Sequence, residues 1–277
     1  MNSRILWRAP NPSLPSETSQ ILSALVHSAI DGVNDAWSTL SRDELGAELR
    51  IGADGTVTSV MDDIVESRVV DAARTVGVNV LSEEIGYIDE GHALTAVIDP
   101  IDGTANATTG VPLSCFSAAL VDPSGVVVEA LNVWLENGAV VWAKRGEPVT
   151  YRTSGRESLA GAAVDMLRPK KHAHGDSMRA WIRVADRSGR VRILSSSCLE
   201  AMLVAQGAID GFCDPGSDTH RIVDLAAALL FIPAAGGAVI DVHGRPFTFE
   251  PDLSLRWSGI IAASAPLAEE IAQTVLG

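Results

Sequence analysis

Asp99-Pro100-Ile101-Asp102-Gly103-Thr104 places two carboxylates three positions apart, directly after the apolar run of residues 94–98. An apolar run of this length predicts a buried strand. Pro100 lacks an N–H donor and fixes one dihedral angle, so we expect the chain to turn there. Gly103 lets backbone approach a ligand closely. Carboxylates beside a hydroxyl and free N–H groups suit a divalent cation and a phosphate together.

Three other stretches carry acids that could join this one. Glu83 and Glu84 follow the apolar stretch 78–81, Asp62 and Asp63 follow the glycine-rich turn 52–56, and Asp224 precedes the apolar run 225–232. Adjacent residues of an extended chain point to opposite sides, so only one of the two glutamates can face a site. From spacing alone, Asp62 at the start of a helical pattern is an N-cap residue.

With these motifs the chain resembles the inositol monophosphatase superfamily of metal-dependent phosphatases, and within it the archaeal-type fructose-1,6-bisphosphatase/inositol-1-monophosphatase. The matching motifs cover most of the chain. They are GADGT (52–56) with Asp62 after it, LSEEIG (81–86), DPIDGTANA (99–107) with GVP (110–112), and IVDLAAALL (222–230) with AAGG (234–237).

The resemblance implies a role for each site residue. It implies metal ligation by Glu83, Asp99, the Ile101 carbonyl, Asp102 and Asp224, with two or three Mg²⁺ ions and Mn²⁺ as a substitute. Asp62 and Thr104 would orient the attacking water, with Glu83 also catalytic, while Glu84 and Asp63 would be neighbours. Substrate contacts would come from Asp102, Gly103, Thr104, Arg192, Ser197 and Arg221. The loop between Asp214 and Arg221 departs from the subgroup, which puts substrate contacts in doubt more than metal contacts.

The implied activity is lithium-sensitive hydrolysis of small polyol or sugar phosphates, inositol-1-phosphate or fructose-1,6-bisphosphate. One alternative is a 3'-phosphoadenosine 5'-phosphate or other nucleotide phosphatase, although Ala105-Asn106 stands where those enzymes tend to have a lysine. Another is a non-catalytic regulatory homologue. A haloacid dehalogenase-type phosphatase fits poorly, because D-x-x-D-G-T is one residue longer than D-x-D-G-T. The sequence contains no P-loop motif.

Hydrophobic periodicity and turn residues predict a layered αβαβα architecture. An antiparallel sheet would carry two long helices, Ser16 to Trp37 (capped by Ser16) and Asp62 to Val76, and would include the meander 115–121, 126–135 and 139–143. Residues 42–50 could form a helix or a lid loop. A smaller mixed sheet flanked by helices would follow, with strands at 162–167, 191–194, 208–213, 238–241 and 260–263 and helices at 199–207, 224–232 and 265–276. We place the domains at 1–155, with most metal ligands, and 156–277, with Asp224 and substrate contacts.

The composition limits the partners and the location. The chain has 277 residues and a net charge of −14, which opposes binding to nucleic acid or an anionic membrane. An anionic substrate is compatible with this charge if metal ions supply the local positive charge. The apolar runs are too short to cross a membrane, and no signal peptide is evident, so we expect a cytoplasmic enzyme, a homodimer by resemblance.

Cysteine and histidine patterns favour no zinc site. Cys115, Cys198 and Cys213 lack C-x-x-C spacing, and we expect buried free thiols. His172 and His174 lie in the one basic cluster, residues 168–174, which we interpret as a solvated loop that could also contact an anion or a metal.

Overall fold

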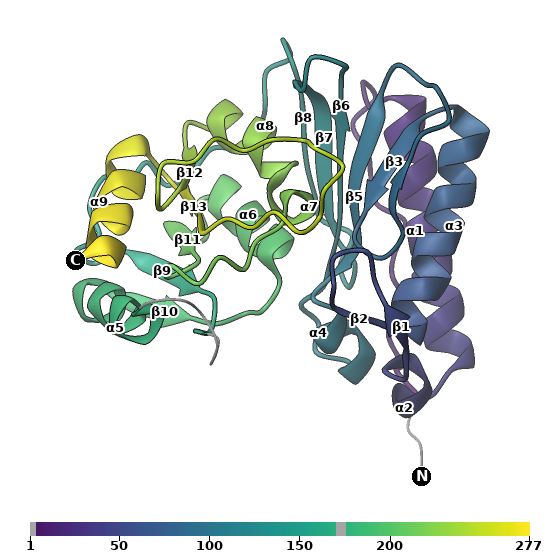
Figure 1. Cartoon of the computed structure of the whole chain (residues 1–277), viewed down its shortest axis with the longest axis horizontal. Coiled ribbons are helices and arrows are strands. Elements are labelled where there is room, and N and C mark those ends of the chain that lie inside the picture. The colour runs from purple at the N-terminus through teal and green to yellow at the C-terminus, as the bar shows by residue number, and fades with distance from the viewer. Residues whose placement is uncertain (1–3, 170–175) are drawn as a thin grey trace.

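The computed structural model describes residues 4–169 and 176–277. Figure 1 shows that the elements stack in five layers, helix, sheet, helix, sheet, helix, as the sequence predicts. The histidine pair of the basic cluster lies outside the described residues. No helix within the described ranges has the length and apolar character that crossing a bilayer requires.

The first layer consists of two long helices that pack against each other, α1 (Gln20–Thr39) and α3 (Val60–Val76). Helix α1 begins later than predicted, because Ser19 caps it by accepting the Leu22 N–H, while the Ser16 hydroxyl bonds to Glu17 instead. Helix α3 begins at Val60, two residues before the predicted start, and its N-cap is Ser59 rather than Asp62. The Ser59 and Asp62 side chains each bond to the other's backbone N–H in a capping box.

The first sheet has the order β4-β3-β5-β6-β7-β8. Its strands are β3 (Asn79–Ser82), β4 (Gly86–Ile88), β5 (Thr95–Asp102), β6 (Cys115–Val121), β7 (Val127–Trp134) and β8 (Val140–Lys144). The predicted antiparallel meander is confirmed in β6 to β8. Strands β3 and β5 pair in parallel, so the sheet is mixed rather than wholly antiparallel.

The turn expected at Pro100 is wrong, because β5 continues to Asp102. Asp99 pairs with Ser117 and Asp102 with Cys115, so three steps on β5 oppose two on β6. This extra residue makes a β-bulge, where a proline is tolerated because its missing N–H interrupts no ladder bond. The bulge changes the direction of the strand between the two aspartates.

A small hairpin covers one end of the first sheet. Residues 42–50, which the sequence allowed to be either a helix or a lid loop, contain a short helix α2 (Arg42–Leu45) and most of strand β1 (Glu48–Ile51). Strand β1 pairs with β2 (Val57–Ser59). The predicted glycine-rich turn, residues 52–56, joins the two strands.

The second sheet is smaller and mixed, with the order β10-β9-β11-β13-β12. Its strands are β9 (Ala163–Met166), β10 (Arg190–Arg192), β11 (Gly211–Cys213), β12 (Ala238–Asp241) and β13 (Gly259–Ala262). Helices α5 (Ser177–Arg187) and α9 (Ala265–Leu276) form the outer layer, and α6 (Ser197–Ala205), α7 (Ile222–Leu225) and α8 (Ala228–Ala234) lie between the sheets.

The helix predicted at 224–232 is two consecutive helices that begin at Ile222. Ala226 and Ala227, between α7 and α8, keep right-handed helical angles, so the axis is interrupted only slightly. Asp224 therefore lies in the first turn of a helix that is buried on all its residues.

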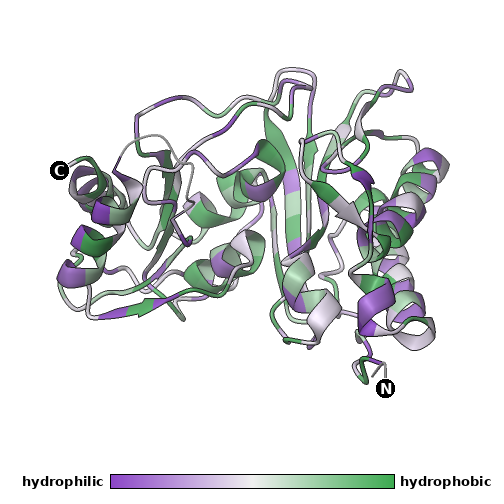
Figure 2. Cartoon of the chain, turned by 60° about the horizontal axis from the view of Figure 1, so that its bottom comes forward, coloured by the Kyte–Doolittle hydropathy of each residue, from purple (hydrophilic) through white to green (hydrophobic). Residues whose placement is uncertain are grey.

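A continuous apolar core joins the two halves. Leu81, Val97 and Ala119 of the first sheet belong to the same buried cluster as Leu199 of α6 and Phe212 of β11. Figure 2 shows apolar residues along the larger sheet and along the helices beside it. Both sheets thus bury side chains against α6, α7 and α8, and the domain boundary at residues 155/156 stays a prediction.

Candidate active site

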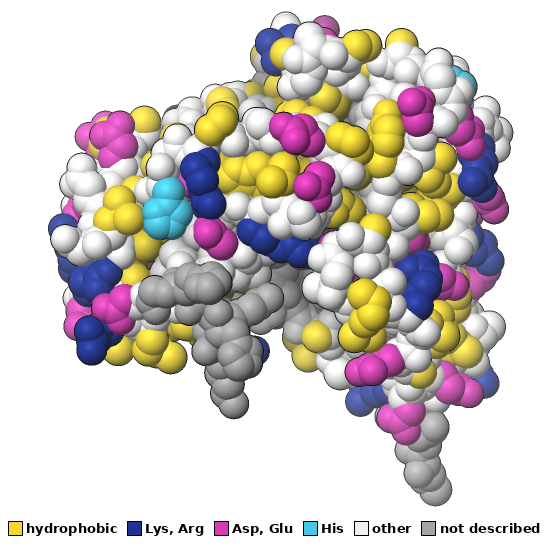
Figure 3. Space-filling view, in the orientation of Figure 1, with side chains coloured by type: hydrophobic (Ala, Val, Ile, Leu, Met, Phe, Trp, Pro, Cys, Tyr) yellow, Lys and Arg dark blue, Asp and Glu magenta, His cyan; other side chains and the backbone are white. Residues whose placement is uncertain are grey.

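A cavity of about 410 Å³ lies between the two halves. In Figure 3, acidic and basic side chains are spread over the whole of the visible face. Five residues that the sequence singled out line the cavity, namely Glu83, Asp102, Ser197, Arg221 and Asp224. The other described lining residues are Asp54, Thr56, Leu167, Ser217, Asp218, Thr219, His220 and Arg256.

Asp99 is the least satisfied carboxylate of the site. Its side chain is buried, and neither oxygen has a hydrogen-bond partner among the described residues. Burial raises the pKa of Asp99 well above its usual range, and the charges of Glu83, Asp102 and Asp224 raise it further. A buried carboxylate without a donor is costly unless a proton or a cation compensates it.

Asp102, on the far side of the bulge, binds the start of α6. Its Oδ2 accepts the Cys198 N–H at 2.7 Å and the Ser196 hydroxyl at 2.6 Å, and its Oδ1 accepts the Ser197 N–H at 3.1 Å. Burial raises the pKa of Asp102 to about 6, although these donors oppose the shift. The acid acts as a helix cap from the other half of the chain.

Glu83 and Glu84 lie in the turn between β3 and β4 rather than on extended chain, and both line a neighbouring cavity, although of the two only Glu83 also lines the first cavity. Glu83 faces the cavity, and burial raises its pKa to about 8, while the charge of Arg221 opposes that shift. The buried Glu84 carboxylate accepts a hydrogen bond from the Thr58 hydroxyl, and burial raises its pKa to about 7.

Arg221 lies among the acids. Its Nη1 contacts Asp54 and Glu83, and its Nη2 donates to Asp224 Oδ1 at 3.0 Å. Burial opposes the ionisation of Asp224, but Arg221 outweighs it and lowers the Asp224 pKa. Arg221, expected as a substrate contact, lines the cavity and in this structure neutralises three carboxylates, of which only Asp224, three positions later, is close in sequence.

Thr104 and Asp62 are in direct contact. The Thr104 hydroxyl lies 2.9 Å from Asp62 Oδ1 and 3.0 Å from the Ile101 carbonyl, so its single hydrogen has two acceptors within reach. Asp62 Oδ2 accepts the Ser59 N–H at 3.0 Å. Asp62 therefore both caps α3 and holds Thr104. Both residues line a second cavity, which shares Thr56 and Glu83 with the first.

Two residues expected to contact substrate, Arg192 and Gly103, are absent from the described lining of the first cavity. Arg192 lies on β10, an edge strand of the second sheet, where it pairs in register with Asp165. Gly103 has φ +81°, and a Cβ there would lie 2.8 Å from the Leu113 carbonyl and 3.0 Å from Ser196 Cβ. The glycine is thus required by the protein's own packing.

Two further cavity residues, Asp54 and Arg256, carry no sequence motif that predicts a role in the site. Asp54 Oδ1 accepts the Thr56 N–H, so its only local signal is that of a turn-forming aspartate. Arg256 reaches the same hairpin by donating to the Asp54 carbonyl at 2.7 Å. That contact joins residues 202 positions apart and has no local sequence signal.

Comparison with known proteins identifies the family. The model of the inositol monophosphatase family matches residues 15–276. The chain belongs to this family. The fructose-1,6-bisphosphatase/inositol-1-monophosphatase of Methanothermobacter thermautotrophicus is 30% identical over 248 residues, which cover 84% of this chain and 88% of that protein. The chain is a phosphatase of the inositol monophosphatase superfamily.

Two further relatives show the breadth of the family. The bifunctional NADP phosphatase/NAD kinase of Methanococcus maripaludis is 29% identical over 236 residues, 76% of this chain and 42% of that longer protein. The crystal structure of extragenic suppressor protein suhB from Bartonella henselae superposes with a TM-score of 0.77 at 23% identity, covering 93% of this chain and 98% of that one. This structural likeness confirms the predicted fold.

Members of the family are generally metal-dependent enzymes that act on small phosphate substrates. The residues present here fit a divalent cation. Within residues 4–169 and 176–277, no donor reaches the two buried oxygens of Asp99, and Glu83, Asp102 and Asp224 lie near enough to affect its ionisation. Oxygen ligands of this kind suit Mg²⁺.

Proposed function

We propose that this protein is a Mg²⁺-dependent phosphomonoesterase that hydrolyses small polyol or sugar phosphates, with inositol-1-phosphate and fructose-1,6-bisphosphate as the leading substrates. The observation that carries the proposal is the buried carboxylate of Asp99, which accepts no hydrogen bond from any described residue, beside Asp102 and near the Asp62–Thr104 pair. A cation held by the two aspartates and a hydroxyl held by a carboxylate are the components of metal-assisted hydrolysis.

The metal ligands in this proposal are Glu83, Asp99, the Ile101 carbonyl, Asp102 and Asp224, holding two or three Mg²⁺ ions, with Mn²⁺ as a substitute. When bound, Mg²⁺ would make water more acidic and offset charge on the phosphoryl and leaving oxygens. Arg221 neutralises Glu83 and Asp224 in the structure. Its guanidinium would therefore have to release at least one of them when a cation binds.

Thr104 and Asp62 would activate the nucleophile. Asp62 fixes the direction of the Thr104 hydroxyl, which can take a proton from the attacking water and pass its own to Asp62. Burial raises the pKa of Asp62, which brings the carboxylate closer to the working pH and makes it a better base. The N–H groups of Gly103 and Thr104 would contact the phosphate, and no phosphoenzyme is required.

The cavity lining favours a polyol over a nucleotide. Ser197, Ser217 and Thr219 offer hydroxyl groups, and Arg256 offers a cation. The described lining residues include no phenylalanine, tyrosine or tryptophan on which a base could stack. A nucleotide phosphatase remains the second candidate, because one relative is named as an NADP phosphatase.

The deciding experiment is a phosphate-release assay with purified protein in Mg²⁺. We expect inositol-1-phosphate or fructose-1,6-bisphosphate to be turned over faster than 3'-phosphoadenosine 5'-phosphate and NADP, with inhibition by Li⁺ and loss of activity in EDTA. Faster hydrolysis of a nucleotide would overturn the substrate assignment. Activity without divalent cation would overturn the metal assignment, and no release from any substrate would favour a regulatory homologue.

We also propose a homodimer in the cytoplasm that binds neither nucleic acid nor membrane. The net charge of −14 supports the last two points, since phosphate backbones and anionic headgroups repel such a protein. Sedimentation analysis with and without RNA tests both the assembly state and the absence of a nucleic acid partner.

A further inference from the structure

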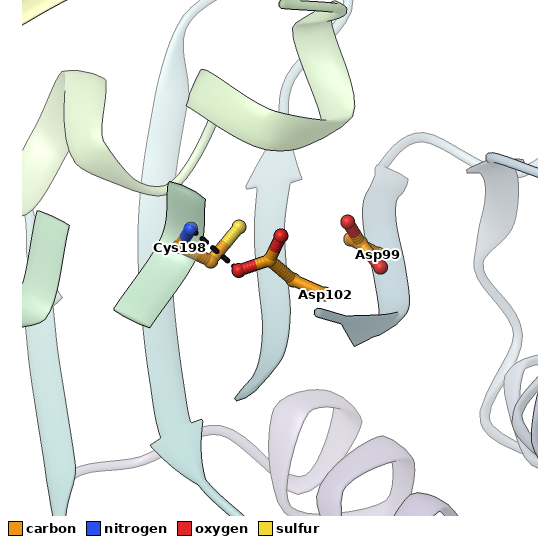
Figure 4. Close-up of side chains that lie close together, drawn as sticks. All are labelled: Asp99, Asp102 and Cys198. Atoms are coloured by element: carbon orange, nitrogen blue, oxygen red, sulfur yellow. Dashed lines mark hydrogen bonds between the residues drawn. The ribbon is translucent and has the colours of Figure 1, made fainter. Parts of the chain in front are cut away.

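We infer that Cys198 adds a sulfur ligand to the acidic site, so that Asp99, Asp102 and Cys198 together bind a thiophilic divalent cation, Zn²⁺ or Cd²⁺, in competition with Mg²⁺. The inference deepens the proposed function, because the two aspartates are proposed Mg²⁺ ligands. Figure 4 shows the three side chains close together, from β5 and α6. One ligand atom from each lies within 4.8 Å of the other two.

The backbone holds Cys198 in place. Its N–H donates to Asp102 Oδ2 at 2.7 Å, which fixes the first turn of α6 against the end of β5. Its thiol is free of any disulfide, is 1% exposed, and lies 3.5 Å from the Asp224 carbonyl oxygen. A thiol is a weak donor, so this contact holds it only loosely. The sulfur can therefore turn toward a cation without loss of a strong hydrogen bond.

Asp99 supplies an independent indication of a cation. Its side chain is 1% exposed, and its two oxygens are without hydrogen-bond donors in the described part of the chain. An oxygen of this carboxylate is one of the three clustered ligand atoms. The cysteine thus stands beside a buried acid that already needs a positive charge.

The choice of metal follows from the donor set. Zn²⁺ binds thiolate sulfur at about 2.3 Å and carboxylate oxygen at about 2.0–2.2 Å, so neighbouring ligand atoms lie roughly 3–4 Å apart around the ion. The three ligand atoms lie within 4.8 Å of one another, so a contraction of at most about 1–2 Å, which side-chain rotation can supply, brings them to these separations. As the metal–sulfur bond forms, the thiol proton leaves to solvent. Mg²⁺ gains nothing from sulfur, so Cys198 favours the softer ion.

The test uses Cd²⁺ alone, added to the full-length protein after chelation and desalting. We expect an ultraviolet cadmium–thiolate absorption band that saturates with Cd²⁺. Cys198→Ser and Cys198→Ala should abolish the band and weaken Cd²⁺ binding at least tenfold by calorimetry. Cys213→Ser is the matched control, because Cys213 is equally buried but belongs to a different apolar cluster, and it should keep the band.

Other outcomes would overturn the inference. They are the absence of a band in the wild type, a band that persists in both Cys198 variants, or a band that Cys115→Ser removes and Cys198→Ser does not. Asp99→Asn is a second probe, which should weaken Cd²⁺ binding with the thiol intact, and unchanged binding would exclude Asp99 as a ligand. Circular dichroism verifies that each variant is folded.

Activity is measured separately, so that the two proposals can fail independently. If no substrate is hydrolysed in Mg²⁺ but the Cd²⁺ band appears and depends on Cys198, the thiolate site stands and the proposed function fails. If substrate is hydrolysed in Mg²⁺ but no Cd²⁺ band appears, the proposed function stands and the thiolate site fails. If both stand, Zn²⁺ should inhibit the Mg²⁺-supported reaction of the wild type at a concentration at least tenfold lower than for Cys198→Ala.

Discussion

Asp62 and Thr104 are 42 positions apart and are joined by one hydrogen bond of 2.9 Å. We predict that Asp62→Asn lowers kcat by about 10²-fold or more with little change in KM, because it removes a general base. An asparagine keeps an oxygen for the Ser59 N–H, so α3 should stay capped. Steady-state phosphate release with the preferred substrate measures the effect.

Asp63→Asn is the control for this prediction. Asp63 is the next residue of α3, but its carboxylate pairs with Arg50 in a partly exposed ion pair. Such pairs contribute little to stability, and we expect kcat within about twofold of the wild type. Equal losses in the two variants would mean that Asp62 has no special role.

Glu84 gives a prediction for pH. Burial first, and then the charges of Asp62, Asp54 and Glu66, raise its pKa to about 7 from 4.5. The folded protein therefore binds this proton more tightly than the unfolded chain, and its stability falls as pH rises between those two values. Glu84→Gln cannot ionise, so in EDTA its Tm should exceed that of the wild type by a few degrees at pH 8 and match it near pH 5.

Thermal unfolding at several pH values tests this. Only the difference between variant and wild type matters, because other carboxylates titrate in both. A difference that is constant from pH 5 to pH 8 would show that Glu84 is ionised in the folded state throughout.

Arg221 gives a prediction for metal removal. In EDTA, Arg221→Gln leaves Asp54, Glu83 and Asp224 without their counter-ion, and we expect a loss of about 3 kcal/mol in the free energy of unfolding. Mg²⁺ should restore part of it. Arg68→Gln, which breaks an exposed pair with Asp35, should cost less than about 1 kcal/mol. Equal denaturation midpoints for the two variants in EDTA would contradict this account.

At the scale of single elements, Gly103 joins the bulged strand to α4 (Thr104–Thr109). Gly103→Ala would place a Cβ against Leu113 and Ser196 as well as straining a φ of +81°, and we expect a cost of about 2–4 kcal/mol. The matched control is Gly125→Ala, with a similar φ of +79° and no atom within 4 Å of the added Cβ, at about 1 kcal/mol. Chemical denaturation of both variants tests the difference.

Local signals predicted some elements closely and missed others. The range of α9 matches its prediction to the residue, because Ser264 caps it and Pro266 stands in its first turn. The continuation of β5 past Pro100 was missed, because the bulge depends on pairing with β6, which the stretch itself does not encode. The predicted start of α1 at Ser16 is too early: Ser19 is the N-cap, and its N–H donates to Glu129 of β7, a tertiary contact with no local sequence signal.

At the scale of the whole molecule, the shared core predicts cooperative unfolding. The apolar cluster between the sheets contains residues from both predicted domains. If one half unfolded alone, the apolar side chains of the other half would become exposed to water, which is unfavourable. We expect tryptophan fluorescence and far-ultraviolet circular dichroism to give one coincident denaturation midpoint. Two separated transitions would show that the halves fold independently.

The site was partly predictable because its acids lie in motifs. Asp99 and Asp102 stand together in the chain, and Glu83, Asp62 and Asp224 each start or follow a recognisable element. Arg221 is a predicted site residue and lines the cavity, but its ion pair with Asp54, 167 positions away, was not predictable, because it forms only when the two halves pack together. The approach of the Cys198 thiol to Asp99 and Asp102 depends on the same packing.

Four hydrogen-bond donors at the start of α6 hold the Asp102 carboxylate, whereas the Asp99 carboxylate accepts none in the described chain. The two acids would therefore give different information when mutated. If Asp102→Asn abolishes activity, two explanations cannot be separated: the loss of a metal ligand, and the displacement of α6 that follows the loss of its cap. Asp99→Asn removes no hydrogen bond to α6. A change in the metal dependence of activity in this variant can therefore be attributed to the lost ligand.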